Sequence, residues 1–371
     1  MSFIPINAAI DRFDRVLAVD YATNSIKVFE TTDLDSEIAV YGNGIFNFNE
    51  HGSAMPDIAY LRADMVEVTG ESLKAADAKN TETEFTFTLA NDFINASFLV
   101  ITDGVETFTF ANDELVGDGG GSGTFNELLG TVTLTFNAAP VAEITANYKH
   151  YGGDKIFVTD PFNHRVVVFK GNGEYITSFG HFGVGNGELY FPAGIAVNST
   201  QVHVVEVYNH RVSIFNNSTY AFVAHYGLQG HDDDEGLYYP TDIALDLTGV
   251  AGAFVTDTGN NRVVYFANSA GTWAEDTTYV VKQFSNNTHT SSRLAVLCMV
   301  NNVGRTGFHL TDVFHSNVET YDVTWDKGTD AATKGTPDGH VILPRGLCIS
   351  GTTDLVVSDT GNQRLQIVDL I

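Results

Sequence analysis

Six acidic residues recur along this chain in the same local context, and carboxylates are groups that bind hard cations and transfer protons. The acids are Asp20, Asp160, Glu206, Asp257, Asp312 and Asp359. Five residues after four of them stands an arginine: Arg165, Arg211, Arg262 and Arg364. A ring of carboxylates could hold a metal ion, but one acid per repeat, paired with a turn or an arginine, is typical of a structural contact. We therefore interpret the six acids as structural.

Each acid follows an apolar run and begins a polar turn, after which apolar residues alternate, as in "DPFNHRVVVF" from Asp160. This order predicts a strand, a tight turn and a second strand. An aspartate side chain bonds the backbone two residues on, and asparagine or glycine accepts the left-handed conformation that such turns need. The acidic motif is therefore predicted to be a hairpin.

The hairpin belongs to a longer repeat. Five short apolar strands begin with a proline, at Pro5, Pro56, Pro192, Pro240 and Pro344. A glycine-rich crossing such as "YITSFGHFGVGNGELYFP" from Tyr175 leads to the next unit, and the last five acids are 46, 51, 55 and 47 residues apart. Four-strand units at this spacing predict an all-β fold, a six-bladed β-propeller.

The stretch "VTDPFNHRVVVF", from Val158 to Phe169, resembles the NHL repeat, whose members form propellers, commonly of six blades. The resemblance covers residues 5–62 and 153–371. It weakens at Asp20 and Asp312, where other residues replace the asparagine and the arginine. It implies an NHL-like propeller.

The repeat is interrupted once, because Asp20 and Asp160 are 140 residues apart. We place a second domain at 63–152, inserted in the second blade. Residues 1–62 then hold blade 1 and the first strand of blade 2, and residues 153–371 hold the rest of the propeller. Alternating residues in "GTVTLTFNAAP" and turns of glycine and aspartate predict that the insert is a small antiparallel β-sandwich.

The order of segments in the insert resembles a small β-module of tailed-bacteriophage virion proteins. The segments are "VITDGVETFTFANDELVG", a glycine-rich turn, "GTVTLTFNAAP" and "ITANYKHY". This resemblance implies a place in a virus particle, and it informs the function more than the propeller does, since propellers serve many functions.

A second set of oxygen-bearing residues lies where the innermost strands begin. Alignment of the repeats equates Asn7, Asp57 and Asp242, and the same position holds Gly194, Arg293 and Gly346 in the other blades. Two carboxylates and an amide around a central channel could hold Ca²⁺ through oxygen ligands. The alternative is ordered water in a polar channel.

Charge excludes one class of partner. The chain has 46 acidic and 19 basic residues and a formal charge of −27, without a cluster of basic residues. Binding to nucleic acid needs cations that neutralise phosphates, so we expect no nucleic-acid partner. The acidic run Asp232, Asp233, Asp234 and Glu235 lacks the spaced ligands of a known Ca²⁺ loop, so a solvated loop is the favoured interpretation over a Ca²⁺ site.

The first residues, "MSFIPINAAIDRFD", have neither a basic region nor an apolar run typical of a signal peptide, and no stretch is long and apolar enough to span a membrane. We therefore expect synthesis in the host cytoplasm, release in a virion, and no membrane insertion.

The leading hypothesis is a non-enzymatic virion structural protein of the tail, fibre or capsid-decoration type. Its propeller would be a display or docking body, and its insert would serve host attachment. The expected partners are other virion proteins or further copies of the chain, with a host surface glycan or protein as a receptor. The alternatives are a metal-dependent propeller enzyme of the lyase or hydrolase type and a secreted adhesin.

The final blade is predicted to have three strands, because only three residues follow Val368. Its last strand then presents an edge, which natural proteins usually cover. We expect the edge residues Gln363, Leu365 and Ile367 to face a partner in the particle.

Overall fold

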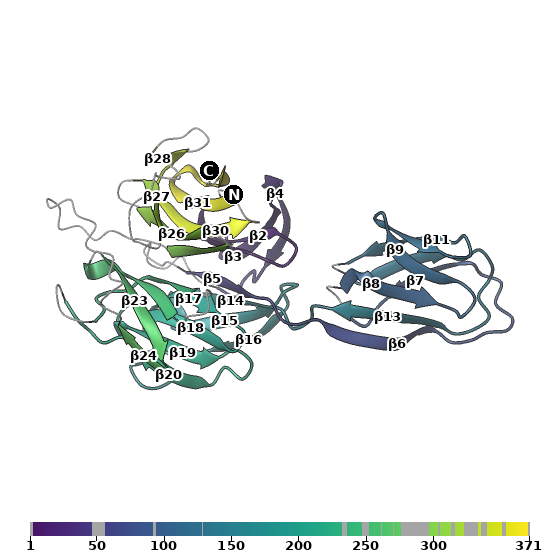
Figure 1. The fold of residues 1–371 in the computed structure, drawn as a ribbon, viewed down its shortest axis with the longest axis horizontal. Helices are drawn as coiled ribbons and strands as arrows, with labels where there is room; N and C mark the ends of the chain where they lie inside the picture. The colour runs from purple at the N-terminus through teal and green to yellow at the C-terminus, as the bar shows by residue number, and fades with distance from the viewer. Residues whose placement is uncertain are drawn as a thin grey trace. The chain divides into compact units, whose positions relative to one another are not determined.

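The fold was analysed in a computed structural model. It describes residues 3–46, 56–91, 94–127, 129–231, 236–246, 252–260, 262–269, 271–275, 297–302, 305–312, 316–322, 333–334, 340–350 and 354–369. Strands dominate these residues, and the described helices are short 3-10 turns: η1 (Pro161–Asn163), η2 (Thr258–Asn260) and η4 (Thr360–Asn362) (Figure 1). No helix in these ranges is long and apolar enough to cross a membrane. The chain is therefore all-β, as expected.

The first three blades are four-stranded sheets. Blade 1 contains β1 (Pro5–Ile10), β2 (Arg15–Asp20), β3 (Ser25–Glu30) and β4 (Asp33–Tyr41) in that order. Blade 2 contains β5 (Ile58–Leu61), β14 (Lys155–Asp160), β15 (Arg165–Lys170) and β16 (Tyr175–Phe179), with the insert between its first two strands. Blade 3 contains β17 (Pro192–Val197), β18 (Gln201–Glu206), β19 (Arg211–Asn216) and β20 (Phe222–Tyr226).

Three further sheets complete the described blades. Blade 4 contains β21 (Asp242–Asp246), β22 (Gly252–Asp257), β23 (Arg262–Ser269) and β24 (Thr272–Glu275). Blade 5 has the described strands β25 (Leu297–Asn302), β26 (Arg305–Asp312) and β27 (Asn317–Asp322). Blade 6 has β30 (Pro344–Ser350), β31 (Asp354–Asp359) and β32 (Arg364–Asp369), and a short parallel pair, β28 (Thr333–Lys334) with β29 (His340–Val341), precedes it.

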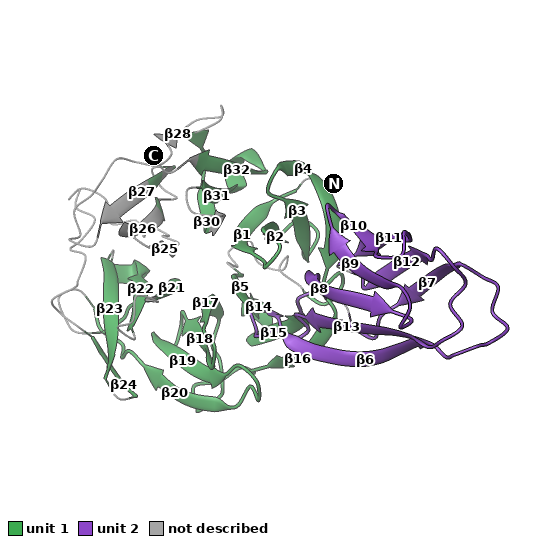
Figure 2. Ribbon diagram, turned by 45° about the vertical axis from the view of Figure 1, so that its right-hand side comes forward, with its two compact units in different colours: residues 1–61, 156–169, 173–371 green, residues 62–155, 170–172 purple. Residues whose placement is uncertain are grey.

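The blades form a closed ring. Their innermost strands contact one another in the order β1, β5, β17, β21, β25 and β30, and β30 returns to β1 (Figure 2). The apolar cores lie between neighbouring blades: one cluster contains Val28 of blade 1 and Val167 of blade 2, and another contains Val205 of blade 3 and Val264 of blade 4. Because both faces of a blade are covered, a strand such as β2 is buried at all six positions. This arrangement is a β-propeller.

In five hairpins the residue four positions after the acid is described and is left-handed. These residues are Asn24, His164, His210, Ser316 and Gln363, with φ between 52° and 57°. Among these five residues, only Asn24 is an asparagine, the residue that usually accepts this conformation. In the turns of blades 2, 3 and 6 the asparagine lies one position earlier, where its side chain bonds the acid, so that histidine or glutamine takes the left-handed position.

The insert is a separate compact unit. The chain divides into one unit of residues 1–61, 156–169 and 173–371 and a second of residues 62–155 and 170–172, which contains the predicted insert, 63–152 (Figure 2). The strands of the second unit are β6 (Val66–Lys74), β7 (Glu84–Thr88), β8 (Ile94–Thr102), β9 (Thr107–Ala111), β10 (Glu114–Gly117), β11 (Ser122–Asn126), β12 (Thr131–Thr135) and β13 (Ile144–His150).

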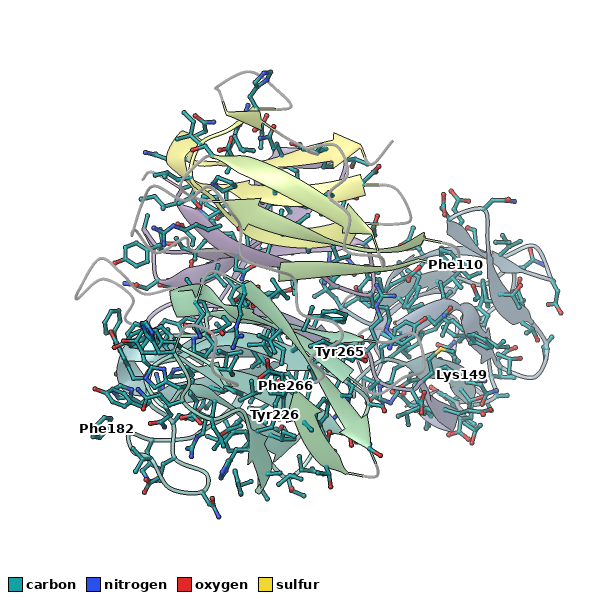
Figure 3. The ribbon with its side chains drawn as sticks, turned by 60° about the vertical axis from the view of Figure 1, so that its left-hand side comes forward. Phe110, Lys149, Phe182, Tyr226, Tyr265 and Phe266 are labelled. Atoms are coloured by element: carbon teal, nitrogen blue, oxygen red, sulfur yellow. The ribbon has the colours of Figure 1, made fainter. Side chains whose placement is uncertain are left out.

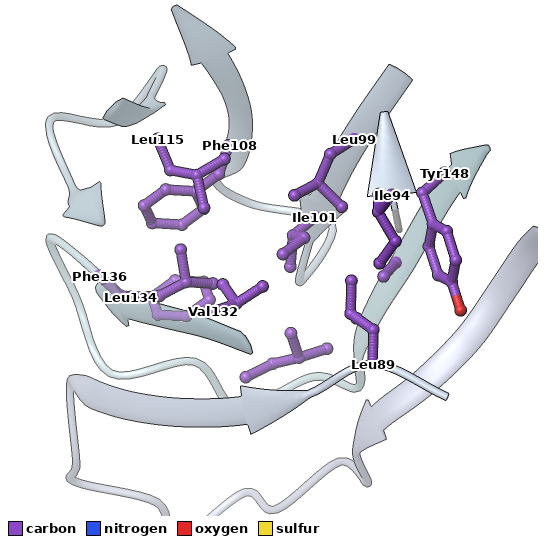
Figure 4. Packing of buried hydrophobic residues seen from close by; sticks show 12 residues of the cluster. Leu89, Ile94, Leu99, Ile101, Phe108, Leu115, Val132, Leu134, Phe136 and Tyr148 are labelled. Atoms are coloured by element: carbon purple, nitrogen blue, oxygen red, sulfur yellow. The ribbon is translucent and has the colours of Figure 1, made fainter. Parts of the chain in front are cut away.

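The insert's strands form one continuous antiparallel sheet in the order β6-β13-β8-β9-β10-β11-β12-β7. In place of two separate sheets, distant parts of this sheet enclose one core, in which Phe108 and Leu115 meet Leu134 and Ile101 (Figure 4). These four side chains are fully buried. The insert therefore has a hydrophobic core of its own.

A buried glutamate explains the glycine-rich turn of the insert. Glu106 Oε1 accepts a hydrogen bond from the Gly121 N–H at 2.5 Å, and Oε2 accepts one from the Asn137 N–H at 2.9 Å. A Cβ on Gly117 or Gly121 would approach Glu106 Oε1 to 2.4 or 2.7 Å. Glycines are needed there because the turn wraps closely around the carboxylate.

Removal of the insert should leave a folded propeller. Within the insert, β6 and β13 pair antiparallel with Val66 opposite His150, so the two ends of this unit lie side by side. We expect a variant with residues 63–152 replaced by a short Gly-Ser linker to keep a β-type circular dichroism spectrum and a cooperative thermal transition. An unfolded, aggregating variant would show that the propeller needs the insert.

Candidate functional site

Glu206, at the end of β18, shows how a repeat acid is used. Its Oε1 accepts hydrogen bonds from Arg211 Nε and Ser213 Oγ, both at 2.6 Å. Its Oε2 accepts bonds from Asn209 Nδ2 at 2.6 Å and from the Tyr190 N–H at 2.9 Å. The side chain is fully buried. Both oxygens of this carboxylate are therefore occupied by donors from the protein.

Asp160, Asp257 and Asp359 make equivalent contacts. Each carboxylate is fully buried and accepts a bond from the Nε of the arginine five residues on, at 2.9, 2.6 and 2.9 Å respectively. Each also accepts from the asparagine three residues on. Asp257 and Asp359 further accept the backbone N–H of Tyr238 and Ile342, which precede the blade's first proline by two residues, as Tyr190 does for Glu206.

Each arginine also ties down the crossing that leads into its own blade. The guanidinium of Arg211 donates to Val184 O at 2.9 Å and to Gly185 O at 3.1 Å. Arg165 donates to Ile45 O at 2.8 Å, and Arg364 donates to His340 O at 3.1 Å. The acid thus fixes the position of the arginine side chain, and the arginine in turn hydrogen-bonds the carbonyl groups of the crossing.

The two atypical copies depart from this pattern. Asp20 accepts bonds from the Ile4 N–H at 2.9 Å and from Thr23 Oγ1 at 2.6 Å, and Lys27 Nζ lies 3.6 Å from its Oδ2. Thr23 and Lys27 thus take over from the missing asparagine and arginine. Asp312 is the last residue of β26. Within the described ranges no three His, Cys, Asp or Glu side chains form a group that could hold a metal ion.

The structure brings Asn7, Asp57 and Asp242 together at the start of the innermost strands. Asn7 Nδ2 donates to Asp57 Oδ1, and the Asp57 and Asp242 side chains share a hydrogen bond. All three side chains are buried. Asp57 Oδ2 also accepts the Ile195 N–H at 2.7 Å, and Oδ1 accepts the Ile58 N–H at 2.8 Å. A cation at this position would compete with these donors.

Glycines leave space for the side chains of Asn7 and Asp242. A Cβ on Gly194 would lie 2.8 Å from Asp242 Oδ1, and a Cβ on Gly346 would lie 2.7 Å from Asn7 Oδ1. These glycines occupy the aligned position in their own blades, which explains why larger side chains are absent there. Arg293, the sixth aligned residue, lies outside the described residues, as do Asp232, Asp233, Asp234 and Glu235.

Burial raises the pKa of Asp57 from its ordinary value of 3.8 to about 7, against the backbone bonds from Ile195 and Ile58 and the bond with Asp242, which lower it. A raised pKa means that the folded protein holds this proton more tightly than the unfolded chain. The resulting stabilisation is complete below pH 3.8 and is lost as the pH rises towards 7.

We expect the Asp57 contribution to lower the free energy of unfolding between pH 4 and 7 by at most about 1.4 kcal/mol per pH unit. Burial lowers the pKa of His203 to about 3, which gives the opposite sign. Urea titrations at several pH values compare the free energy of unfolding of wild type with that of Asp57→Asn. The difference reports the contribution of Asp57, because His203 is present in both proteins. Parallel profiles for the two proteins would contradict this assignment.

The hypothesis of a central cation makes a separate prediction. An ion bound only by the folded state raises the melting temperature by mass action. If Asn7, Asp57 and Asp242 bind Ca²⁺, millimolar Ca²⁺ should raise the melting temperature of wild type and leave that of Asp242→Ala unchanged. Equal shifts in the two proteins, or no shift in wild type, would remove the hypothesis.

Of the predicted edge residues of the last blade, Leu365 and Ile367 lie on β32, and Gln363 directly precedes this strand. This strand pairs with β31, and no other described strand pairs with it. Leu365 is buried, whereas Gln363 and Ile367 are exposed. Residues 5–10 form the innermost strand of blade 1 and pair with β2, so they do not extend the last blade.

An aromatic cluster on two crossings and one hairpin turn was not predicted from the sequence. Phe182, Tyr190, Phe191, Tyr208, Tyr238 and Tyr239, which we call the aromatic face, form a continuous series of ring contacts across blades 2 to 4. Neighbouring ring centroids lie 4.5 to 5.9 Å apart. The crossings were interpreted only as glycine-rich connections. A comparison of aligned positions for residue type could have revealed the aromatic residues.

Comparisons with known proteins agree with the propeller fold. A family model described as a 6-bladed β-propeller, DUF5128, matches residues 142–232. Among solved structures, a streptogramin B lyase is similar with a TM-score of 0.50 and 11% identity, over 100% of this chain and 94% of that chain. A search of curated proteins finds no match.

Two further solved structures are more distant. The β-propeller domain of Cps50 (Swd1) from Myceliophteria thermophila has a TM-score of 0.48 and 7% identity, over 99% of this chain and 97% of that chain. Virginiamycin B lyase from Staphylococcus aureus, in a complex with quinupristin, has a TM-score of 0.40 and 13% identity, over 77% and 88%. The family model and the match to streptogramin B lyase agree with the ring of blades described above, and the chain is a β-propeller protein.

Proposed function

We propose that this protein is a non-enzymatic structural component of a virus particle, of the tail, fibre or capsid-decoration type. The propeller is a rigid docking body, and the insert is a displayed module for host attachment. The propeller is NHL-like, as the Asn-His-Arg turns at Asn163 and Asn209 indicate. The protein is made in the host cytoplasm and leaves the cell with the particle.

The observation that carries the proposal is the use of the repeat acids. In four blades the asparagine and the arginine donate hydrogen bonds to the acid, and the arginine also bonds the crossing. The residues whose side chains could best perform chemistry therefore stabilise the propeller. A rigid ring of this kind suits docking. The insert, with its own core and with its two ends paired in β6 and β13, is built as a module carried by one blade.

The resemblance of the insert to virion modules gives the proposal its setting, and the charge of −27 favours a soluble particle surface. The test is mass spectrometry of gradient-purified particles from a host that carries the gene. We expect peptides of this chain to co-sediment with the major capsid protein. Peptides confined to the soluble lysate, or metal-dependent turnover of an ester, lactone or hydroxyglycine substrate by the purified protein, would overturn the proposal.

A further inference from the structure

The repeat does not require aromatic residues at the positions of the aromatic face, as a comparison with the last blade shows. Its aligned positions, two residues and one residue before the strand's first proline, hold Ile342 and Leu343. Leu343 has the same left-handed backbone, φ 48°, as Phe191 at 56° and Tyr239 at 48°. The backbone at this position therefore accepts an aliphatic residue, and the aromatic side chains of blades 3 and 4 need another explanation.

The hairpin turn of blade 3 adds a further ring. The position two residues after the acid holds Tyr208 in blade 3, glycine in blades 4 and 6 at Gly259 and Gly361, and in blades 1, 2 and 5 it holds Ala22, Phe162 and Phe314. A Cβ on Gly259 would lie 2.4 Å from Tyr238 O, so in blade 4 this turn is packed tightly against the crossing. In blade 3, Tyr208 occupies the same position and is 46% exposed. The repeat therefore accepts residues from glycine to phenylalanine at this position, so its packing alone does not require an exposed tyrosine.

Three of the six rings, those of Phe182, Tyr208 and Tyr239, are exposed, and contacts between rings hold them in place. Phe182 is 61% exposed and Tyr239 is 38% exposed, and Phe182 projects at the margin of the ribbon, whereas Tyr226 and Phe266 lie within it (Figure 3). The Tyr208 ring packs edge-on against Phe191 and Tyr239. Such packing fixes the rings before any partner arrives, which lowers the entropy cost of binding.

Two histidines support the face without adding charge. His164 Nδ1 accepts the Phe191 N–H at 3.1 Å, and His210 Nδ1 accepts the Tyr239 N–H at 3.0 Å. A ring nitrogen that accepts a hydrogen bond carries no proton, so both imidazoles are neutral in this arrangement. Burial lowers the pKa of both histidines, which agrees with the neutral form.

The charge of this part of the sequence favours a basic partner. Residues 156–245 contain nine acidic and three basic residues; Arg165 pairs with Asp160 and Arg211 with Glu206, which leaves seven acids and one lysine outside these two pairs. Four of the seven acids, 232–235, lie outside the described residues. The face of an aromatic ring attracts cations, and tyrosine is among the residues used. An acidic surface also favours approach of a basic partner. We propose that the aromatic face binds an arginine- or lysine-bearing segment of a protein partner.

The inference goes beyond the proposed function, because binding is measured on the isolated protein without a particle. The probe is a fluorescent 12-residue Arg-Gly repeat peptide in 150 mM salt. Wild type is compared with the double variant Tyr208→Leu/Tyr239→Leu. The matched control is Tyr175→Leu on β16, because Tyr175 is also 46% exposed but lies outside the aromatic face. Thermal melting confirms that each variant is folded.

We expect the double variant to bind the peptide about tenfold more weakly and the control to bind it as wild type does. A Lys-Gly peptide should bind and a Ser-Gly peptide should not. Absence of binding to wild type would overturn the inference. Equal affinity of wild type and the double variant would also overturn it, because the peptide would then be attracted by the acidic surface as a whole. Binding of maltohexaose to this face in place of the basic peptides would also overturn it.

Discussion

Replacement of Glu206 by alanine is expected to destabilise the propeller by about 3–5 kcal/mol. The change leaves Arg211, whose side chain is only 10% exposed, without its carboxylate. It also removes the acceptor of Asn209 Nδ2 and of the Tyr190 N–H. A buried charge without a partner costs far more than the loss of an exposed ion pair. Urea denaturation followed by circular dichroism measures the effect.

The matched control is Glu30→Ala, which removes an exposed carboxylate and should change stability by about 0.5 kcal/mol or less. A double variant that also lacks the arginine, Glu206→Ala/Arg211→Ala, should be less destabilised than the sum of the two single changes, because no charge is then left buried. If Glu206→Ala were as stable as Glu30→Ala, Glu206 would not stabilise its blade. A functional role for this acid would then have to be considered again.

Replacement of Glu106 by alanine is expected to unfold the insert selectively, with a loss of about 3 kcal/mol in that unit. The carboxylate accepts the backbone N–H groups of Gly121 and Asn137, and bonds to charged groups contribute about 1.5–3 kcal/mol each. The buried residues of the insert's hydrophobic core lie between Leu89 and Tyr148, within the insert. The thermal transition of the propeller should therefore remain. Differential scanning calorimetry should show one transition lowered and the other unchanged.

Glu114→Ala serves as the control for the insert, because Glu114 is exposed on β10. It should leave both transitions in place. A single transition that shifts as a whole in Glu106→Ala would mean that the two units unfold together, and the insert would then not be an independent module.

Several features of the fold could be predicted because they have a short-range chemical cause. The acid, the asparagine and the arginine lie within six residues, so their mutual contact follows from one hairpin, and the spacing of such hairpins predicts the blades. The approach of Asn7 to Asp57 follows from the alignment of the innermost strands, although these residues are 50 positions apart.

Other features depend on long-range contacts that the letters do not specify. The role of His164 and His210 is one of these, because their rings accept the backbone N–H groups of Phe191 and Tyr239, which lie in the next crossing. The single sheet of the insert depends on pairings such as β7 with β12, which are distant in sequence. The aromatic face arises only when crossings of successive blades lie side by side.

The central claim is that the propeller docks and the insert is displayed, and antibody fragments on intact particles test it most directly. One fragment is raised against the insert and another against the aromatic face, and both are checked on the free protein. We predict that electron microscopy shows particles decorated by the insert fragment, while the fragment against Tyr208 and Tyr239 binds only free protein. Intact particles that bind the second fragment and not the first, or neither, would contradict the account.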